Sequence, residues 1–205
     1  MSYVGSVIIG YLLGCFNPAS VLGKRHKLNL RELGSKNLGA SNVLLTMGKA
    51  RGFLVMVVDI AKAFLAARIA RLLFPKLAVG GMLAAFGAIL GHIYPFHMGF
   101  RGGKGLAAFG GMVLAYNPWM FAALLALCCV LVVVVNYSFV APATVAVLFP
   151  ILVAVTSADP WMTLIAAAAG ALIVYKHWDN FLKAVRGSDF KIRDIIAGKH
   201  RSGRE

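Results

Sequence analysis

The stretch YVGSVIIGYLLGCFNPASVLG occupies residues 3–23 and decides the fold class, because its 21 residues carry no charge. A helix of about 20 apolar residues is long enough to cross the hydrocarbon core of a bilayer. The basic cluster Lys24-Arg25-His26-Lys27 follows directly. Since cytoplasmic loops carry an excess of Lys and Arg, this cluster predicts an N-terminus outside and a cytoplasmic segment from residue 24 onward.

The composition of the whole chain agrees with a membrane protein. Hydrophobic residues make up 60% of the 205 residues and charged residues 14%, whereas a soluble domain carries about 25% charge. The net charge of +14 would suggest a nucleic-acid partner in a soluble protein. Here Lys and Arg cluster between apolar runs, so we expect the chain to lie in a lipid bilayer and to bind no nucleic acid.

Six further apolar stretches follow the first. The sequence therefore predicts an all-α integral membrane protein of about seven transmembrane helices, forming a single domain over residues 1–205 with a basic tail at about 187–205. The six stretches are Phe53–Phe74, Leu77–Pro95, Leu106–Tyr116, Trp119–Val135, Phe139–Thr156 and Pro160–Tyr175.

Leu106–Tyr116 is short, since eleven helical residues reach only about 16 Å across a core of roughly 30 Å. Charge decides whether it counts as a span. With seven spans, the inside segments 24–52, 96–105 and 176–205 hold 17 of the 21 Lys and Arg residues, and the C-terminus is cytoplasmic. We therefore expect this helix to be extended by Arg101–Gly105, or to lie where the bilayer is thinned or shielded.

Two features inside the predicted spans indicate packing. Gly10 and Gly14, like Gly87 and Gly91, have the small-residue spacing that lets helices approach closely. Asp59 and Lys62 are three residues apart and share a helix face, and we favour a structural ion pair over a transport pathway. The chain has no internal repeat, which gives an inverted-repeat transporter no support.

A first polar loop, residues 33–42, reads LGSKNLGASN. Its glycines permit close approach of the backbone to a ligand, and its Ser and Asn side chains supply uncharged hydrogen bonds. Lys36 adds a positive charge. The alternative is a plain turn followed by a helix cap at Ser41 or Asn42.

A second polar loop, residues 92–105, reads HIYPFHMGFRGGKG and ends where a helix is predicted to begin. Exposed backbone amides, a helix N-terminus and Lys104 are typical of a phosphate site. The loop is not a Walker A motif, so nucleotide hydrolysis is not implied. The alternative is a hairpin whose basic side chains extend to the interface. His92 and His97 lack a third partner at metal-binding spacing, and we expect no metal and no cofactor.

A third polar cluster ends the last apolar stretch. His177 and Asn180 lie three residues apart and so share a helix face, where both can point at one ligand. The alternative is an interfacial belt formed by Tyr175, Lys176 and Trp178.

These three clusters together resemble a known family. The first loop is similar to its Gly-Ser-x-Asn-x-Gly-Ala-x-Asn motif, the second to its His-x-x-Pro and Gly-Gly-Lys-Gly elements, and the third to its His-x-x-Asn motif. The chain thus resembles, over nearly its whole length, the bacterial acyl-phosphate-dependent glycerol-3-phosphate acyltransferases of the PlsY type. The family also carries an Asp-x-x-Lys pair where Asp59 and Lys62 lie in this chain, and the resemblance implies seven helices.

The resemblance implies a reaction. A fatty acyl group would pass from acyl phosphate to the 1-hydroxyl of glycerol 3-phosphate, giving lysophosphatidic acid and phosphate without a cofactor or an obligatory protein partner. The enzyme would lie in the bacterial inner membrane with its active site facing the cytoplasm. The catalytic residues implied are Ser35, Lys104, His177 and Asn180, and the substrate-binding residues are Lys36, Asn37, Gly39, Asn42, His92, Arg101, Gly102, Gly103 and Gly105.

Our hypothesis is that Lys104 and the glycine amides bind a substrate phosphate, and that His177 and Asn180 orient glycerol 3-phosphate. Ser35, Asn37 and Asn42 would hold polar oxygens. Acyl phosphate is a mixed anhydride with a good leaving group, so orientation and charge neutralisation matter more than a covalent nucleophile.

Four positions depart from the family pattern. Lys36 replaces a usual Gly, Leu45 a common Arg, Pro142 a common Ser and Arg101 a usual Lys. The Leu45 change removes a cation expected to bind glycerol 3-phosphate, and Lys36 is the nearest replacement in the sequence. The alternatives are a relative with another phosphorylated acceptor or no activity, and a small anion transporter.

Overall fold

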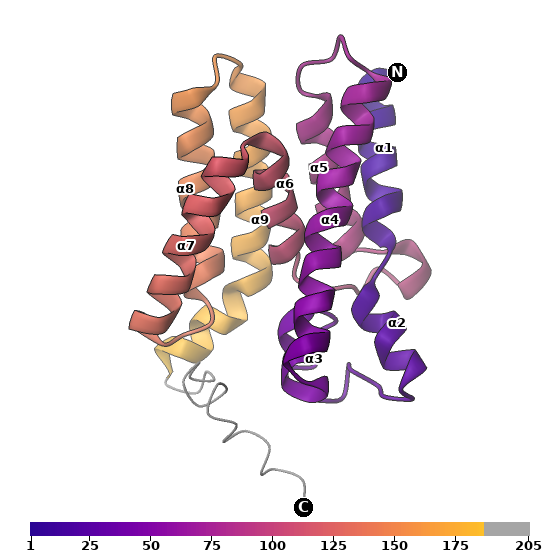
Figure 1. The fold of residues 1–205 in the computed structure, drawn as a ribbon, viewed down its shortest axis with the longest axis vertical. Coiled ribbons are helices and arrows are strands. Elements are labelled where there is room, and N and C mark those ends of the chain that lie inside the picture. The colour runs from indigo at the N-terminus through magenta and orange to yellow at the C-terminus, as the bar shows by residue number, and fades with distance from the viewer. Residues whose placement is uncertain (187–205) are drawn as a thin grey trace, which may run out of the picture.

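The computed structural model describes residues 1–186, and these fold into nine α-helices and one short 3-10 helix with no β-strand among them (Figure 1). The basic tail predicted at about 187–205 lies outside the described residues. The helices are α1 (Ser2–Cys15), α2 (Pro18–Arg25), α3 (Ala40–Met47), α4 (Lys49–Leu73), α5 (Gly80–Ile93), η1 (Phe96–Met98), α6 (Leu106–Tyr116), α7 (Pro118–Val135), α8 (Val140–Thr156) and α9 (Pro160–Val185).

The first apolar stretch is not one helix, which corrects the sequence prediction. Helix α1 ends at Cys15, Phe16 is extended, and α2 begins at Pro18. Proline disfavours helical geometry at the residue before it, and its own missing N–H is harmless at the first position of a helix. Asn17 caps α2 by accepting a hydrogen bond from the Ser20 amide at 2.8 Å. The break leaves the Phe16 carbonyl available to another partner.

The other six apolar stretches each form one helix, with different ends. Helix α9 continues to Val185, so the third polar cluster lies on the same helix as the apolar stretch 160–175. Helix α3 falls inside the polar stretch, where a helix capped at Ser41 or Asn42 was only the alternative interpretation. Helix α6 keeps its eleven residues, because Arg101–Gly105 is not helical, and the expected extension is therefore wrong.

Helix α6 is instead shielded by protein. A Cβ atom added at Gly111 would lie 2.2 Å from the Ile60 carbonyl oxygen of α4, so the two backbones are in direct contact. On another face, the buried ring of Phe109 packs edge-to-face on Phe149 of α8, with ring centroids 5.6 Å apart. These contacts place the short helix in the middle of the bundle.

The predicted glycine packing is confirmed between α1 and α5. A Cβ atom at Gly10 would lie 1.9 Å from the Ala84 carbonyl oxygen, and one at Gly14 would lie 2.2 Å from that of Ala88. Conversely, a Cβ atom at Gly91 would lie 2.1 Å from the Tyr11 carbonyl oxygen. The two helices therefore meet backbone to backbone, as small-residue spacings in membrane helices allow.

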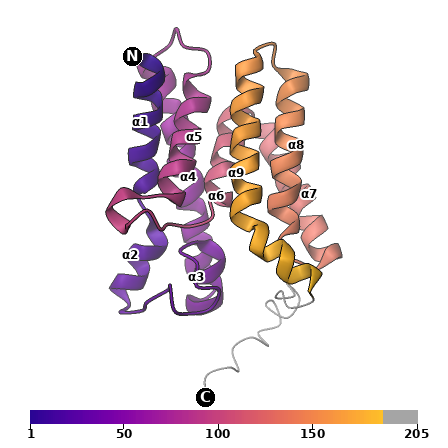
Figure 2. The same cartoon turned by 180° about the vertical axis from the view of Figure 1, so that it is seen from behind.

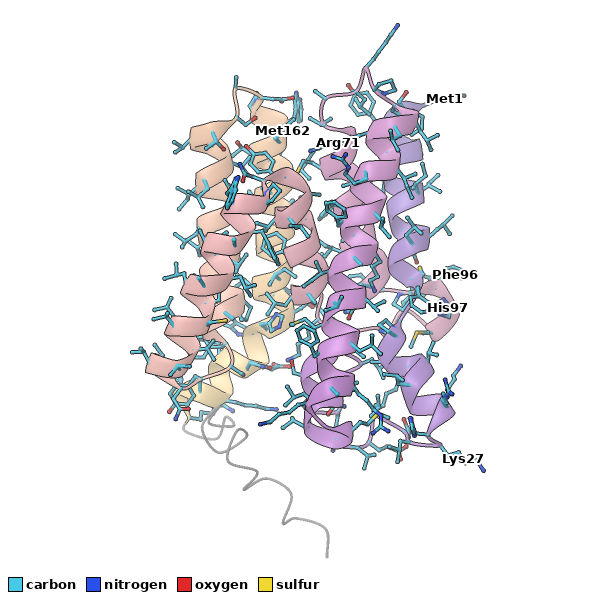
Figure 3. The ribbon with its side chains drawn as sticks, viewed as in Figure 1. Met1, Lys27, Arg71, Phe96, His97 and Met162 are labelled. Carbon is cyan, nitrogen blue, oxygen red and sulfur yellow. The ribbon has the colours of Figure 1, made fainter. Side chains whose placement is uncertain are left out.

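The helices form two groups, with α1 to α5 on one side, α7 to α9 on the other and α6 between them (Figures 1 and 2). Figure 3 places Met1, Arg71 and Met162 toward one end of the molecule and Lys27 at the other. Helix α3 and the C-terminal end of α9 lie at the Lys27 end (Figure 1). The basic segments that flank the polar loops thus gather at one end.

Length and composition alone mark only two helical stretches of the described residues as able to cross a membrane. They are Ser2–Arg25, taken across the break, and Pro118–Val135, with α6 and α8 as shorter apolar helices. The predicted number of seven spans therefore remains a prediction.

Candidate active site

The first loop is held in shape by Asn42, whose side chain is fully buried. Its Oδ1 accepts a hydrogen bond from the Ser35 amide at 2.8 Å, and its Nδ2 donates to the Leu30 carbonyl at 2.8 Å. A Cβ atom at Gly34 would lie 2.4 Å from the same Oδ1, and Gly34 has a positive φ of 56°. Asn42 thus closes the loop from within, which requires glycine at position 34.

The outer part of this loop is exposed and starts α3. Ser35 and Lys36 are exposed, Asn37 is partly buried, and Lys36 adopts a φ of 59° that is uncommon for residues other than glycine. Buried Gly39 is the N-cap residue, two residues before Ser41 and three before Asn42, the caps that the sequence suggested. Ser35 and Lys36 therefore remain accessible, and their role in substrate binding stays a prediction.

The second loop folds back onto the end of α5. The amide of Gly102 donates to the Ile93 carbonyl at 2.9 Å, and that of Gly103 to the His92 carbonyl at 3.1 Å. Both amides are therefore engaged within the protein, and phosphate binding by this loop is a proposal that rests on Lys104. Gly105, with a φ of 88°, caps α6, which begins at the next residue as predicted.

Arg31, two residues before the first loop, ties this segment to the second loop and was not among the predicted site residues. Its Nη2 donates to the Arg101 carbonyl at 2.5 Å and to the Met98 carbonyl at 3.5 Å. The Arg101 side chain is itself exposed at the same loop. In the sequence, Arg31 is one of several basic residues between positions 24 and 36, and nothing distinguishes it from the others.

Lys104 lies at the junction of the second loop and the third cluster. Its ammonium donates a hydrogen bond to Asn180 Oδ1, and Asn180 Nδ2 donates to Ser138 Oγ at 3.3 Å. The contacts therefore bring together residues from the start of α6, the end of α9 and the connection between α7 and α8. Ser138 was missed, although a serine between two apolar stretches was a signal that could have found it.

His177 is held in a defined tautomer. It lies beyond the apolar stretch 160–175, and its Nδ1 donates to the Ile173 carbonyl at 2.9 Å, which leaves the lone pair on Nε2. Burial is the main cause that lowers the pKa of His177 to about 4, and the charges of Lys104 and Lys176 lower it further. The imidazole is therefore neutral near pH 7 and can accept a hydrogen bond at Nε2.

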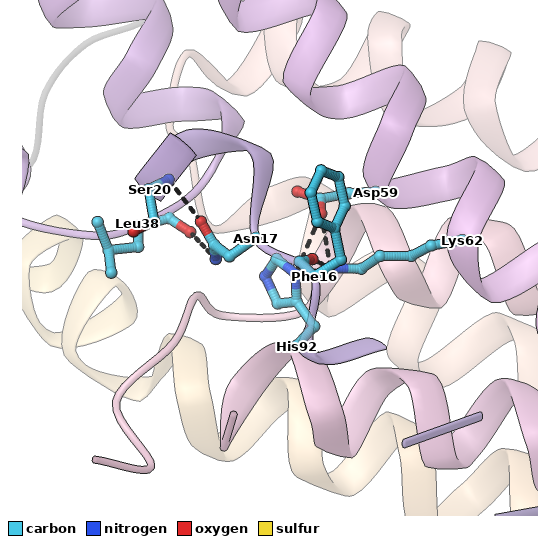
Figure 4. A network of polar contacts seen from close by, with 7 residues as sticks. All are labelled: Phe16, Asn17, Ser20, Leu38, Asp59, Lys62 and His92. Carbon is cyan, nitrogen blue, oxygen red and sulfur yellow. Dashed lines mark hydrogen bonds and ion pairs between the residues drawn. The ribbon is translucent and has the colours of Figure 1, made fainter. Parts of the chain in front are cut away.

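The side chain of His92 is buried inside the protein, whereas a substrate-binding residue was expected to be accessible. Its side chain is 3% exposed and is enclosed by Asp59, Lys62 and Gly103. The predicted pair of Asp59 and Lys62 is confirmed at 2.8 Å, with His92 as an unforeseen third member (Figure 4). No group of three His, Cys, Asp or Glu side chains with a metal-binding arrangement occurs within residues 1–186.

The sequence model of the glycerol-3-phosphate acyltransferase family matches residues 4–187. The chain belongs to this glycerol-3-phosphate acyltransferase family. Curated relatives with that name agree. The protein of Coxiella burnetii (strain Dugway 5J108-111) is 36% identical over 196 residues, covering 94% of this chain and all of that protein. The protein of Bordetella avium (strain 197N) is 35% identical over 193 residues, covering 91% of each.

Two solved structures have the same fold as this acyltransferase-family chain. Both are crystal structures of PlsY, an integral membrane glycerol 3-phosphate acyltransferase. The glycerol 3-phosphate form has a TM-score of 0.88 and 29% identity, over 96% of this chain and 98% of that one. The lysophosphatidic acid form has a TM-score of 0.85 and 28% identity, over 96% and 100%. The resemblance to the PlsY family is thereby confirmed, and it extends from motifs to the whole fold.

Proposed function

We propose that this chain transfers a fatty acyl group from acyl phosphate to the 1-hydroxyl of glycerol 3-phosphate, producing lysophosphatidic acid and inorganic phosphate. Membership of the glycerol-3-phosphate acyltransferase family supports the acceptor and the reaction class. The forms in which the two PlsY neighbours were solved, with glycerol 3-phosphate and with lysophosphatidic acid, support the same acceptor and product.

The observation that carries the proposal is the contact between Lys104 and Asn180. It joins a cation from the glycine-rich loop to the helix that presents His177. An ammonium group neutralises a phosphate, while the Nε2 lone pair of His177 can accept a hydrogen bond from the attacking hydroxyl. One cation and two uncharged polar groups suit a reaction that needs orientation and charge neutralisation.

The chemistry requires one bond exchange. The 1-hydroxyl oxygen of glycerol 3-phosphate forms a bond to the acyl carbonyl carbon, and the bond from that carbon to the phosphate oxygen breaks. The electron pair leaves with inorganic phosphate, whose charge Lys104 stabilises. The hydroxyl proton passes to His177 Nε2 or directly to a phosphate oxygen. With a pKa of about 4, His177 is a weak base, which favours the phosphate as the final proton acceptor.

Acyl phosphate as the donor is supported by the chemistry of the chain itself. The sequence has no His-x4-Asp motif, which marks the other acyltransferase class. Its loops are basic, and both proposed substrates carry phosphate, so one charged face suits both.

We place the protein in the bacterial inner membrane with seven spans, its N-terminus outside and the Lys27 end in the cytoplasm. This topology is supported by the 17 of 21 Lys and Arg residues on the predicted inside segments. It is also supported by the gathering of Lys27, α3 and the end of α9 at one end of the molecule (Figures 1 and 3).

A second candidate is transfer to another phosphorylated alcohol. The observation in its favour is Leu45, an apolar residue of α3 where the family pattern has a cation. Lys36 is exposed on the adjoining loop, and we propose that it replaces the missing charge. If it does, glycerol 3-phosphate remains the acceptor.

The test is acyl transfer by the purified full chain in liposomes, using palmitoyl phosphate and labelled glycerol 3-phosphate. The wild type should form lysophosphatidic acid, and Lys104→Ala should abolish it. Lys76→Ala, which removes an exposed cation between α4 and α5, is the matched control and should retain activity. Wild-type activity that survives Lys104→Ala would remove Lys104 from the mechanism. A folded wild type active only on another phosphorylated alcohol would favour the second candidate.

A further inference from the structure

A buried network of charged groups connects three helices behind the second loop. Lys62 Nζ lies 2.8 Å from Asp59 Oδ1 and donates to the Phe16 carbonyl at 2.8 Å. The same Nζ lies 2.8 Å from His92 Nδ1, and Asp59 Oδ1 lies 3.2 Å from that nitrogen. Figure 4 shows these groups converging from the end of α1, from α4 and from the end of α5.

The Phe16 carbonyl belongs to this network because of the break between α1 and α2. A helix end presents carbonyl groups without partners and a partial negative charge. Lys62 is 6% exposed and Asp59 is 1% exposed, so neither has water to solvate it. The carbonyl and the carboxylate together surround the ammonium with two acceptors, which stabilises a charge that is otherwise costly at this depth.

The opposite edge of His92 faces the second loop. A Cβ atom at Gly103 would lie 2.2 Å from His92 Nε2 and 2.7 Å from the Leu38 carbonyl oxygen. That carbonyl accepts a hydrogen bond from Asn17 Nδ2 at 3.2 Å. Gly103 is therefore enclosed between the imidazole, whose other nitrogen is fixed by Lys62, and the backbone of the first loop. The next residue in the chain is Lys104.

Apolar side chains would fill this space at less cost if packing were the only requirement, since buried ion pairs are often neutral or destabilising relative to hydrophobic replacements. A rigid hydrogen-bonded support is instead useful where one cation must keep its position. Displacement of a catalytic group by about 1 Å can cost about a hundredfold in rate.

We propose that Asp59, Lys62 and His92 form a positioning network for Lys104, and that His92 acts on the Gly102-Gly103 backbone without touching substrate. The network fixes the imidazole through Nδ1, and the imidazole limits the movement of Gly103. This inference rests on the proposed function for its kinetic part. Its structural part concerns the loop alone and can be measured without turnover.

His92→Asn is the sharpest variant. An asparagine amide reaches about as far as Nδ1 and can keep the contact with Lys62, but it leaves the space against Gly103 empty. We expect kcat for acyl transfer to fall by roughly tenfold or more while KM for glycerol 3-phosphate changes less. Amide hydrogen exchange in the peptide containing Gly102 and Gly103 should become faster in the absence of substrate. Without the imidazole the loop moves more freely, so the hydrogen bonds of both amides to the backbone carbonyls of Ile93 and His92 open more often.

Asp59→Asn tests the network from its other side, since it keeps the shape of the side chain and removes the charge that faces Lys62. The same loss of kcat and the same faster exchange are expected. Ser6→Ala is the control, because Ser6 is also fully buried and hydrogen-bonded within α1, to the Ser2 carbonyl at 2.9 Å. It should leave kcat and the exchange of the second loop unchanged.

Two results would overturn the inference. One is wild-type loop exchange and wild-type kcat in folded His92→Asn. The other is faster exchange spread evenly over the chain, which would make the network a general contributor to folding. Because exchange needs no substrate, faster local exchange in a protein without acyl transfer would support the network while removing the proposed function.

Discussion

Asn180 Oδ1 accepts a hydrogen bond from the ammonium of Lys104, which ties the end of α9 to the residue that precedes the cap of α6. The same amide group donates to Ser138 from the connection between α7 and α8. Asn180 therefore accepts a hydrogen bond from Lys104 with its side-chain oxygen and donates one to Ser138 with its side-chain nitrogen. Only one orientation of the amide group satisfies both partners. The position of the Lys104 ammonium therefore depends on α9 and on the connection between α7 and α8 as well as on the second loop.

Replacing Asn180 by Asp should weaken the binding of anionic substrates. A carboxylate beside Lys104 would neutralise its charge and repel phosphate, so we expect KM for glycerol 3-phosphate to rise by about tenfold or more. Steady-state kinetics in liposomes would measure this. Asp179→Asn changes charge at the neighbouring exposed position and should leave KM nearly unchanged. An unchanged KM in Asn180→Asp would show that phosphate does not bind beside Lys104.

His177 should make stability depend on pH. Its folded pKa of about 4 lies below the unfolded value of about 6.5, so the unfolded chain binds more protons between these pH values. The stabilising contribution is therefore full above pH 6.5 and is lost as pH falls toward 4. Thermal unfolding in detergent at pH 7.5, 6 and 5 should show a steeper decline for wild type than for His177→Asn.

His26→Asn is the control for this comparison, since His26 is exposed near the end of α2. It should keep the wild-type slope. Equal slopes for wild type and His177→Asn would mean that His177 is not buried in a neutral form. The kcat profile should also lack an inflection from His177 between pH 5.5 and 8.

Two adjacent glycines of α6 should respond oppositely to alanine. A Cβ atom at Gly111 would lie 2.2 Å from the Ile60 carbonyl oxygen, which forces α4 and α6 apart and should cost about 1–3 kcal/mol. At Gly110 the nearest atom is Phe121 Cε2 at 3.5 Å, an ordinary contact. Alanine there should be neutral or stabilise by about 0.5–1 kcal/mol, because glycine disfavours helices. Unfolding temperatures in detergent would distinguish them, and equal values would contradict the packing of α6 on α4.

Lys36→Gly should separate stability from binding. Glycine accepts the positive φ of this position without strain, so stability should rise by about 1 kcal/mol. The lost charge should raise KM for glycerol 3-phosphate several-fold if Lys36 replaces the cation missing at Leu45. Lys36→Ala should raise KM without the gain in stability.

Adding Leu45→Arg to Lys36→Gly restores the family pattern at both positions and should lower KM again. A double variant whose KM stays high would show that position 45 does not face the acceptor here. Competition assays with glycerol 1-phosphate, dihydroxyacetone phosphate and glycerol 3-phosphate would then identify the preferred phosphorylated alcohol.

Much of the fold was accessible from the sequence because hydrophobic length and small-residue spacing are local properties. The apolar stretches marked the helices, and the Gly-xxx-Gly spacings marked two of them as closely packed without identifying their partners. The break at Phe16 was less visible, because an Asn-Pro pair can be tolerated within a membrane helix when its freed carbonyls find partners. That partner, Lys62, lies 46 residues away.

The site shows the same division between local and distant information. Lys104, His177 and Asn180 stand out by residue type and spacing, whereas Ser138 and Arg31 matter only through contacts across 42 and 70 residues. His92 was assigned to substrate binding because the resemblance to the family implies that role. Its burial depends on α4, whose position no local pattern reveals.

The shortness of α6 bears on how a water-soluble acceptor and a lipid-bound donor can meet. Under the proposed topology, the eleven residues of α6 extend about 16 Å and cover roughly half of a core about 30 Å thick, so the loops at its two ends together take up the remaining depth. A polar acceptor that meets the loop of Lys104 would then cross only part of that depth from the water. The chain of an acyl phosphate could stay in the hydrocarbon throughout.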